Sequence, residues 1–592
     1  MRPIDRKMPG SVHETSRLLI PTHDSGVKEK SDHSFKISLF FAVCISIGVV
    51  CWTNLTPQHE GLTALDSTTN ADALESDESN APFYKKITYR DFLEHDKVLK
   101  FIESRGLSNA SAEWELLEYL PKELLITGDP ELIMGGGDQG YIGATAMEGL
   151  TTWSMQHKNT SGLYNSAFTI VLDMRGNVVS ISPTMYHLAD SYHFISWKPW
   201  HRDPNFMLGG VDIQAAQDGP VYLWNWNGQK DEEYISLMNG LQADCHDVSS
   251  TYTNDAIWVT ADNRGIQMLN YTDGSIMKTR IFPKDIVRDP NHAQMIEHDR
   301  TGIISSRITN SIVKVPLLGD GVEWICGGKN GTIDIIDENG KYWPAGHTIW
   351  QGQHNVEYIG EQEYLLFDDQ SSVSWDGVSE SQTAEQSRLL LLRIDEKKKV
   401  AKIKWTYPVG AYTPIFGDAD LMPTGNILGT MWVGSYNCTN WTSMVGCNNY
   451  PYDAQVTEVV KATSKVAWSV RIVGNESIKN NNAWFGWSIY SSERMYEKPL
   501  VYQAVCKKTE EGSVIHFRTQ DMIRSNNAAP GQWILKDTDS KEVVSSGNFS
   551  FVPFWRPTEV TLRVDDWSKC NGTIFIGNQW GKWRETILEE TE

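Results

Sequence analysis

The chain has 592 residues, of which 40% are hydrophobic and 22% are charged, so it is too long for one small domain and too apolar to be disordered throughout. Acidic residues outnumber basic residues 75 to 53, and the resulting net charge of -22 argues against a nucleic-acid-binding protein. The 23 Trp, 46 Gly and 22 Tyr favour strands and tight turns, so we expect a large, acidic, mostly β protein.

An uncharged apolar stretch covers residues 37–56. As a helix, about 20 residues cross a bilayer, which predicts a membrane anchor. A cleaved signal peptide is the alternative, but a long tail precedes the stretch and no A-x-A cleavage pattern follows it. Basic residues exceed acidic ones in residues 1–36, whereas residues 57–82 contain six acids and no Lys or Arg. The positive-inside rule therefore predicts a single-pass type II membrane protein with a cytosolic tail and a lumenal or extracellular main body, in the Golgi, the endomembrane system or the cell surface.

Two segments separate the anchor from the main body. Residues 57–82 are rich in Ser, Thr, Asn and acids, which is typical of a disordered, solvated stalk. Residues 83–130 carry apolar positions at helical spacing, so we expect a helical lead-in.

Nine N-x-S/T sequons lie beyond residue 100, a dense set that agrees with a lumenal glycoprotein. Their asparagines are Asn109, Asn159, Asn270, Asn330, Asn437, Asn440, Asn475, Asn548 and Asn571.

Six cysteines follow the apolar segment, an even number in a compartment that we predict to be oxidising. Cys438 and Cys447 are close enough in sequence to join one loop, and we also pair Cys506 with Cys570. No CxxC motif occurs, so we expect neither a zinc site nor a thioredoxin-like site.

From residue 131 to about residue 500, short apolar runs alternate with turns rich in Gly, Asn and Asp, which predicts many short strands. A weak repeat recurs at spacings of 46, 62 and 64 residues, close to the period of propeller blades. Each repeat opens on a polar residue followed by an apolar strand, and the openings are Cys245-His246-Asp247, Asn291-His292-Ala293, Gln353-His354-Asn355 and Gly417-Asp418-Ala419. The pattern changes in residues 501–592, which we interpret either as a small β-sandwich or as the strands that close the ring.

The repeat has a geometric consequence for three histidines. The first strand of each propeller blade lines the central channel, so equivalent openings converge on one axis. We therefore expect His246, His292 and His354 to lie within reach of a common ligand.

Several well-known motifs are absent. The chain contains no P-loop, no GxSxG elbow, no HExxH and no EF-hand loop, and no phosphosulfate-binding loop of the TYPKSGT kind. These absences argue against a nucleotide-dependent sulfotransferase, and we expect no cofactor and no metal.

Ten short segments occur in a definite order and spacing within residues 165–500. They are Cys245-His246-Asp247-Val248, Asp289-Pro290-Asn291-His292, Ile304-Ser305-Ser306-Arg307, Trp324-Ile325-Cys326-Gly327-Gly328, Gln353-His354-Asn355, Leu366-Phe367-Asp368-Asp369, Ser387-Arg388-Leu389, Arg393-Ile394-Asp395, Gly417-Asp418-Ala419-Asp420 and Pro423-Thr424-Gly425-Asn426. Together they resemble the arylsulfotransferase (aryl-sulfate sulfotransferase, ASST-like) family. The resemblance implies an all-β, six-bladed β-propeller that moves a sulfuryl group between phenols without a nucleotide donor, through a sulfo-histidine.

The resemblance implies roles for the residues of this chain that match the family motifs. His246 and His354 are expected to bind or protonate the sulfate ester, and His292 with Arg307 forms a neighbouring polar pair. Sulfuryl transfer spreads negative charge over equatorial oxygens, so it needs cationic donors and a general acid for the departing phenolate. Imidazole also serves as a covalent acceptor. The expected substrate-binding residues are Arg388, Asn355 and Asp418.

The chain departs from the family pattern at two places. The covalent histidine is expected near Asn437, which belongs to a sequon, and the arginine expected after Asp368-Asp369 is missing, with Arg388 as its only nearby replacement. We therefore keep two hypotheses. In the first, the partners are an aryl sulfate, a phenolic acceptor and a membrane, with no nucleic acid. In the second, a catalytically inactive lumenal propeller binds a glycan or a protein.

Overall fold

The computed structural model describes most of the chain beyond residue 80. The described residues are 81–107, 113–133, 147–158, 164–183, 192–213, 221–228, 234–236, 246–250, 256–261, 264–296, 298, 300–317, 319–370, 386–413, 415–433, 453–474, 486–565, 567 and 570–591. The predicted anchor and stalk therefore lie outside the described residues, as do Cys438 and Cys447. Within the described part, no helix is both long enough and apolar enough to cross a membrane.

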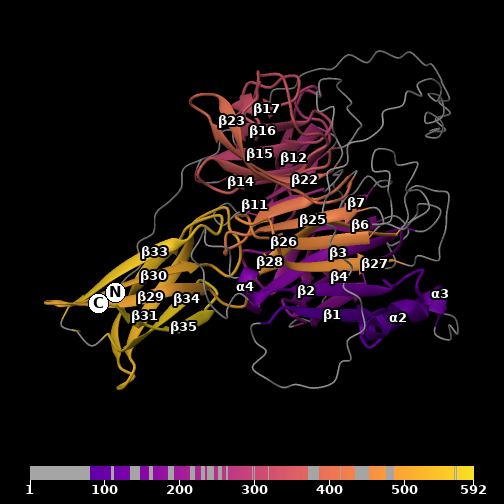
Figure 1. Cartoon of the computed structure of the whole chain (residues 1–592). Helices are drawn as coiled ribbons and strands as arrows, with labels where there is room; N and C mark the ends of the chain where they lie inside the picture. The colour runs from indigo at the N-terminus through magenta and orange to yellow at the C-terminus, as the bar shows by residue number, and fades with distance from the viewer. Residues whose placement is uncertain are drawn as a thin grey trace, which may run out of the picture. The chain divides into compact units, whose positions relative to one another are not determined.

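Small antiparallel sheets dominate the structure between residues 150 and 495 (Figure 1). We number six of them in chain order, each starting from its innermost strand. Sheet 1 consists of β28 (Gly486–Met495), β3 (Leu150–Lys158), β4 (Tyr164–Asp173) and β5 (Val178–Pro183). Sheet 2 consists of β6 (Tyr192–Pro199), β7 (Phe206–Ile213), β8 (Val221–Asn225) and β9 (Tyr234–Ser236). Sheet 3 consists of β10 (Val248–Ser250), β11 (Ala256–Ala261), β12 (Gly265–Asn270) and β13 (Ile276–Ile281).

Sheets 4 to 6 follow the same plan, and two of them carry extra strands at the outer edge. Sheet 4 consists of β14 (Pro290–Ile296), β15 (Thr301–Ser306), β16 (Ser311–Pro316) and β17 (Trp324–Gly327). Sheet 5 consists of β20 (His354–Tyr358), β21 (Glu363–Asp368), β22 (Arg388–Asp395) and β23 (Val400–Pro408), followed at its outer edge by β18 (Asp334–Ile336) and β19 (Tyr342–Trp343). Sheet 6 consists of β24 (Asp418–Leu421), β25 (Ile427–Val433), β26 (Asp453–Val459) and β27 (Val466–Val473), followed at its outer edge by β2 (Glu123–Gly128) and β1 (Phe83–Thr88).

The first strands of the six sheets contact one another in a cycle that runs β6, β10, β14, β20, β24, β28 and back to β6. The cycle closes because β28 pairs with β3, with Gly486 opposite Lys158 and Met495 opposite Leu150. Each sheet itself remains open, and the arrangement is propeller-like. The repeat openings identified in the sequence stand at or just before the starts of β10, β14, β20 and β24.

Two of the innermost strands, β14 and β28, are buried along their whole length. All residues of β14 and all ten residues of β28 are buried, because neighbouring sheets cover both of their faces. Such strands do not show the alternation of apolar and polar residues that marks a half-exposed strand. Polar side chains in these strands therefore lie inside the molecule, around the axis.

The lead-in at residues 83–130 is not wholly helical, contrary to the sequence prediction. Besides α1 (Tyr89–Phe92), α2 (Asp96–Ser104), α3 (Glu113–Leu116) and α4 (Pro130–Ile133), it contains β1 and β2. Among the described helices, only α2 is longer than one turn. β2 pairs with the outer strand of sheet 6, β27, whose free edge supplies the backbone partners that local helical spacing does not reveal.

Residues 500–591 form two four-stranded sheets that share one apolar core. In sheet order, their strands are β33 (Thr558–Asp565), β30 (Gly512–Gln520), β29 (Leu500–Thr509) and β36 (Glu589–Thr591), and β32 (Val543–Phe551), β31 (Ala529–Asp537), β34 (Gly572–Asn578) and β35 (Trp583–Ile587). We call this region the C-terminal sandwich. The strand that completes the cycle of contacts, β28, precedes the C-terminal sandwich.

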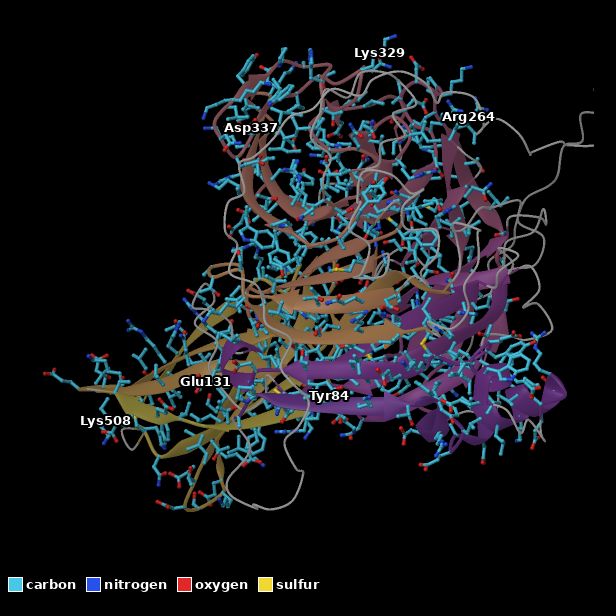
Figure 2. All side chains as sticks on the ribbon, turned by 45° about the vertical axis from the view of Figure 1, so that its right-hand side comes forward. Tyr84, Glu131, Arg264, Lys329, Asp337 and Lys508 are labelled. Carbon is cyan, nitrogen blue, oxygen red and sulfur yellow. A yellow bond between two sulfur atoms is a disulfide. The ribbon has the colours of Figure 1, made fainter. Side chains whose placement is uncertain are left out.

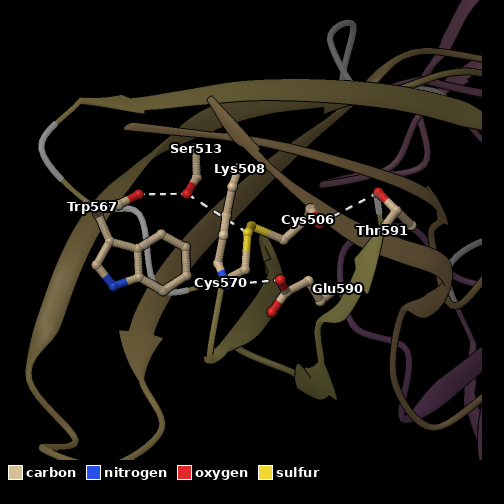
Figure 3. Close-up of a disulfide and its surroundings, with 7 residues drawn as sticks. All are labelled: Cys506, Lys508, Ser513, Trp567, Cys570, Glu590 and Thr591. Atoms are coloured by element: carbon tan, nitrogen blue, oxygen red, sulfur yellow. Dashed lines mark hydrogen bonds and ion pairs between the residues drawn. A yellow bond between two sulfur atoms is a disulfide. The ribbon is translucent and has the colours of Figure 1, made fainter. Parts of the chain in front are cut away.

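A disulfide joins Cys506 and Cys570 inside this sandwich (Figure 3). The ion pair between Lys508 and Glu590 (2.7 Å) lies beside it. Four sequon asparagines belong to the described residues, and two of them, Asn548 and Asn571, are exposed on the sandwich. The other two are Asn270 and Asn330, both half-buried.

Candidate active site

The rings of His246 and His354 both lie near the ring of one tyrosine, Tyr490. The ring centroid of Tyr490 is 6.0 Å from that of His246 and 5.9 Å from that of His354. Tyr490 comes from β28, and its hydroxyl donates a hydrogen bond to the carbonyl of Asn291 (2.6 Å). His246 lies just before β10 of sheet 3, His354 begins β20 of sheet 5, and Tyr490 belongs to sheet 1, so three sheets bring together side chains that are far apart in the sequence. We call His246, Tyr490 and His354, with the residues that contact them, the histidine cluster.

His354 forms a dyad with a carboxyl group. Its Nδ1 lies 2.8 Å from Oδ2 of Asp369, and its Nε2 accepts a hydrogen bond from the backbone N–H of Phe416 (3.4 Å). The imidazole is only 2% exposed, and this burial, with the nearby Arg307 and His246, holds its pKa well below the usual value. Burial also raises the pKa of Asp369 well above its usual value, against the opposing charge of Arg307. The lowered pKa favours a neutral His354, and the N–H that Phe416 donates to Nε2 puts the lone pair on Nε2 and the ring proton on Nδ1.

Arg307 supplies the positive charge nearest to this dyad. Its Nε lies 2.6 Å from Oδ2 of Asp289, and its side chain is about one-quarter exposed. Although burial raises the pKa of Asp289, Arg307 and His246 outweigh that effect and leave the pKa lowered, so the carboxylate is ionised. Arg307 therefore stands beside the dyad as one half of an ion pair.

His292 does not belong to the histidine cluster. Its Nδ1 lies 2.9 Å from Oδ2 of Asp247, whose other oxygen lies 2.9 Å from Nζ of Lys198. Nε2 of His292 is buried and has no hydrogen-bond partner among the described residues. Burial lowers the pKa of this imidazole, although Asp247 opposes the shift. The three histidines are thus divided between two layers of the axis.

The second layer is built by all six sheets. Each contributes one titratable side chain from its first strand, or from the residue just before that strand, and we call the set the axial charge ring. Its members are Lys198, Asp247, His292, Glu357, Asp420 and Glu493.

Arg524, from the segment that joins two strands of the C-terminal sandwich, enters this ring. Its guanidinium forms ion pairs with Glu357, with Asp420 (2.5 Å) and with Glu493 (3.2 Å). Burial lowers the pKa of Arg524, but these three acids outweigh it and raise the value. A cavity of about 40 Å³ beside Arg524 is large enough for little more than a water molecule.

Acids outnumber cations in this layer, and several acids resist ionisation. Burial raises the pKa of Glu357 well above its usual value, and raises that of Glu493 to about 7, against the opposing charge of Arg524. The same holds for Asp418 at the start of β24, where burial and the neighbouring acids raise the pKa. Lys198 and Arg524 are already paired with acids of this layer, so an anionic ester is better accommodated near Arg307.

The expected substrate-binding residues have different surroundings. Arg388 pairs with Asp368 (2.9 Å) and Glu338 (3.0 Å) and donates to the carbonyl of Ile349. Its described contacts therefore connect it to the edge of the histidine cluster through Asp368, the neighbour of Asp369. Asp418 borders the axial charge ring instead.

Asn355 shapes the strand that carries His354. It is buried, with a left-handed φ of 45°, and the register of β20 against β21 shifts between His354 and Glu357. Asparagine tolerates this conformation better than most residues. The resulting bulge lets one short strand place His354 in the histidine cluster and Glu357 in the axial charge ring.

Three important residues were not predicted from the sequence: Tyr490, Glu493 and Arg524. The first two lie on β28, and a search for the strand that closes the ring would have found them in the run Gly486–Met495. Arg524 lies between strands of a different sheet pair, and no local pattern marks it.

The fold and the site thus define a mostly β, propeller-like protein with a histidine–carboxyl dyad and an arginine near its axis. Residues 290–481 match the model of the family described as Arylsulfotransferase (ASST). The family resemblance predicted from the sequence is therefore confirmed for this segment, which holds His292, Arg307 and His354 but not His246 or Tyr490.

Other comparisons are distant. No curated protein matches the chain. A nidogen/laminin complex aligns with 58% of this chain and 98% of its own at 8% identity and a TM-score of 0.30. The β-propeller domain of Cps50 (Swd1) from Myceliophteria thermophila aligns with 53% of this chain and 85% of its own, at 8% identity and a TM-score of 0.30. A mitotic checkpoint complex aligns with 56% of this chain and 81% of its own, at 9% identity and a TM-score of 0.29. TM-scores this low carry no argument about this chain.

Proposed function

We propose that this chain is a sulfotransferase-type enzyme that moves a sulfuryl group from an aryl sulfate ester to a phenolic or hydroxyl acceptor without a nucleotide. The observation that carries the proposal is the His354–Asp369 dyad beside Arg307, within a segment that matches the arylsulfotransferase family. We further propose that the six sheets are the blades of a closed six-bladed propeller. A type II anchor at residues 37–56 and a glycosylated lumenal or extracellular body complete the proposal.

The residues suggest a two-step reaction. In the first step, Nε2 of His354 attacks the sulfur while the bond from sulfur to the ester oxygen breaks, and the departing phenolate takes a proton from His246. In the second step, His246 accepts the proton of the acceptor phenol, whose oxygen attacks the sulfur and breaks the bond to His354. Arg307 stabilises the charge on the sulfuryl oxygens. Asp369, whose Oδ2 lies 2.8 Å from Nδ1, orients the imidazole and so its attacking lone pair.

Substrates would enter from the side of the histidine cluster. His246 is half-buried and His354 is almost fully buried, whereas the axial charge ring is filled by Arg524. Entry at the His246 side puts an aryl sulfate next to Arg307 and away from the surplus acids of the second layer.

The assay uses the full chain with 4-nitrophenyl sulfate as donor and phenol as acceptor, and it follows the release of 4-nitrophenolate. We expect His354→Ala and His246→Ala each to lower kcat/KM by about 100-fold or more. His516→Ala, at a half-buried position of β30 in the C-terminal sandwich, serves as the control and should leave the rate unchanged. Mass spectrometry of the donor-treated wild type should show an acid-labile sulfo-histidine. A folded wild type without turnover, or a His354→Ala variant with wild-type turnover, contradicts the proposal.

A specific observation favours a second candidate, a catalytically inactive binding module. Nε2 of His354 already accepts a bond from Phe416, and Arg307 is already paired with Asp289. In addition, Asn437 stands where the resemblance predicts the covalent histidine. A folded chain that binds 4-nitrophenyl sulfate or a glycan, but forms no sulfo-histidine, would support this candidate.

A further inference from the structure

A second cavity lies away from the axis, between the ring and the C-terminal sandwich. Its volume is about 480 Å³, within the range of about 300–1,000 Å³ that is typical of small-molecule sites. One wall is the turn between β20 and β21, and the other is the segment 552–557 with the neighbouring strands β30 and β33. None of its lining residues belongs to the histidine cluster or to the axial charge ring.

Aromatic rings form the apolar part of this cavity. Tyr358 and Phe554 contact each other edge to face with their centroids 5.1 Å apart, and the ring of His298 lies 6.4 Å from Phe554. Phe554 is buried and Tyr358 is half-buried, so the two rings present limited but well-supported surfaces. Such surfaces suit the C–H face of a ring-shaped ligand.

Paired charges form the polar part. Arg518 lies 2.7 Å from Glu559, and Arg556 lies 2.7 Å from Glu363. Because each guanidinium already has a carboxylate partner, the wall has little net charge. It nevertheless offers both strong donors and strong acceptors side by side.

The walls are held in place before any ligand arrives. The side-chain amide of Gln294 donates to the carbonyl of Tyr358 (3.0 Å) and accepts from its N–H (2.7 Å), and Arg556 donates to the carbonyl of Ile359 (2.8 Å). Fixed walls lower the entropic cost of binding.

Left-handed backbone occurs in both of these walls. The four residues Glu361, Gln362, Phe554 and Trp555 all have left-handed φ values, between 53° and 65°. Non-glycine residues adopt this conformation only where the surroundings enforce it, and such residues cluster at ligand-binding sites.

We propose that this cavity binds a neutral hexopyranose unit of a glycan. A sugar ring combines a C–H face that packs on Tyr358 and Phe554 with hydroxyl groups that donate to Glu559 and accept from Arg518. An anionic ligand would have to displace the glutamates from the two arginines, and an apolar ligand would bury these charges without hydrogen bonds. The proposal is independent of the sulfotransferase proposal.

The test is saturation-transfer NMR on the full chain with the methyl glycosides of glucose, galactose, mannose and N-acetylglucosamine. We expect transfer from at least one of them, with a dissociation constant on the order of 1 mM. Arg518→Met and Glu559→Gln should each weaken binding about tenfold or more. Lys508→Met is the matched control, because Lys508 forms a similar exposed ion pair on the same sandwich, with Glu590 (Figures 2 and 3).

Three outcomes overturn the proposal. The first is no transfer from any of the four glycosides to the folded wild type. The second is binding of glucuronate in preference to all four, which would assign the cavity to an anion. The third is unchanged binding in both Arg518→Met and Glu559→Gln. Near-ultraviolet circular dichroism of each variant confirms that the compared proteins are folded.

Discussion

At the scale of single residues, the axis combines groups whose pKa values move in opposite directions. Burial lowers the pKa of His354 and raises those of Asp369, Glu357 and Glu493, so it favours the uncharged form of each. In the histidine cluster, this gives a neutral imidazole that can act as a nucleophile. In the axial charge ring, burial keeps Glu357 and Glu493 protonated to a higher pH than exposed glutamates, so the folded chain loses these protons only as the pH rises.

Glu493 provides a pH-dependent prediction. Its pKa is raised to about 7 in the folded chain, above the usual value of a glutamate, so the folded state binds more protons between these two values. The free energy of unfolding should therefore decrease as the pH rises from about 5 to about 7.5. Glu493→Gln removes this titration, and we expect a smaller decrease in denaturant titrations at the two pH values. Glu559→Gln, at an exposed acid, should keep the wild-type decrease. An identical pH dependence in Glu493→Gln and the wild type would contradict the assignment.

At the scale of elements, one disulfide connects the two sheets of the C-terminal sandwich. The Cys506–Cys570 disulfide closes a loop with a sequence separation of 64 residues within the C-terminal sandwich. It links β29 to the residues just before β34, which belong to opposite sheets. The disulfide therefore holds the two sheets together at one end of their common core.

Removing this disulfide should destabilise the sandwich. For a loop of this length, the entropic model gives a loss of about 4 kcal/mol in the free energy of unfolding. We expect Cys506→Ala/Cys570→Ala to show this loss in denaturant titrations that follow the aromatic signal. Reductant should produce a similar loss in the wild type and none in the double variant. Equal stability of the oxidised wild type and the double variant would show that the bond adds nothing.

Sequence patterns predicted some elements better than others. The mostly β class and the repeat openings followed from polar residues that begin buried apolar strands, as at His292 and His354. The pairing of β2 with β27 could not be predicted, because the partners are more than 300 residues apart and leave no local pattern. The separation of His292 from the other histidines also escaped prediction, since β14 has a register shift between Pro290 and His292 and β20 has another between His354 and Glu357, and neither leaves a sequence pattern.

At the scale of the whole molecule, Arg524 connects the C-terminal sandwich to three sheets of the ring. Its acid partners come from β20, β24 and β28, and all of them are buried. Residues such as Tyr490 and Arg524 reach the axis only because segments far apart in the sequence pack together in the complete fold. That is why the sequence predicted individual histidines of the site but not the residues that surround them.

Arg524→Met should destabilise the ring in a pH-dependent way. Loss of one partner from a buried charge network costs about 3–5 kcal/mol, because the remaining charges lose their compensation. We expect this loss near pH 7.5 and a smaller one near pH 5, where more of the acids are protonated. Arg584→Met is the control, because Arg584 pairs with the half-exposed Glu148. It should cost less, with no such pH dependence. A pH-independent loss in Arg524→Met would argue against the acid network as its cause.

The pairing of β28 with β3 also sets an order of events at the ribosome. β3 emerges early, but its inner partner is synthesised more than 300 residues later, so the first sheet stays incomplete through most of translation. During that interval, apolar residues of β3 such as Trp153 and Met155, which are fully covered in the finished ring, remain open to chaperones or to wrong partners. Nascent chains stalled before residue 486 should therefore be captured by chaperones more readily than chains stalled just after residue 495.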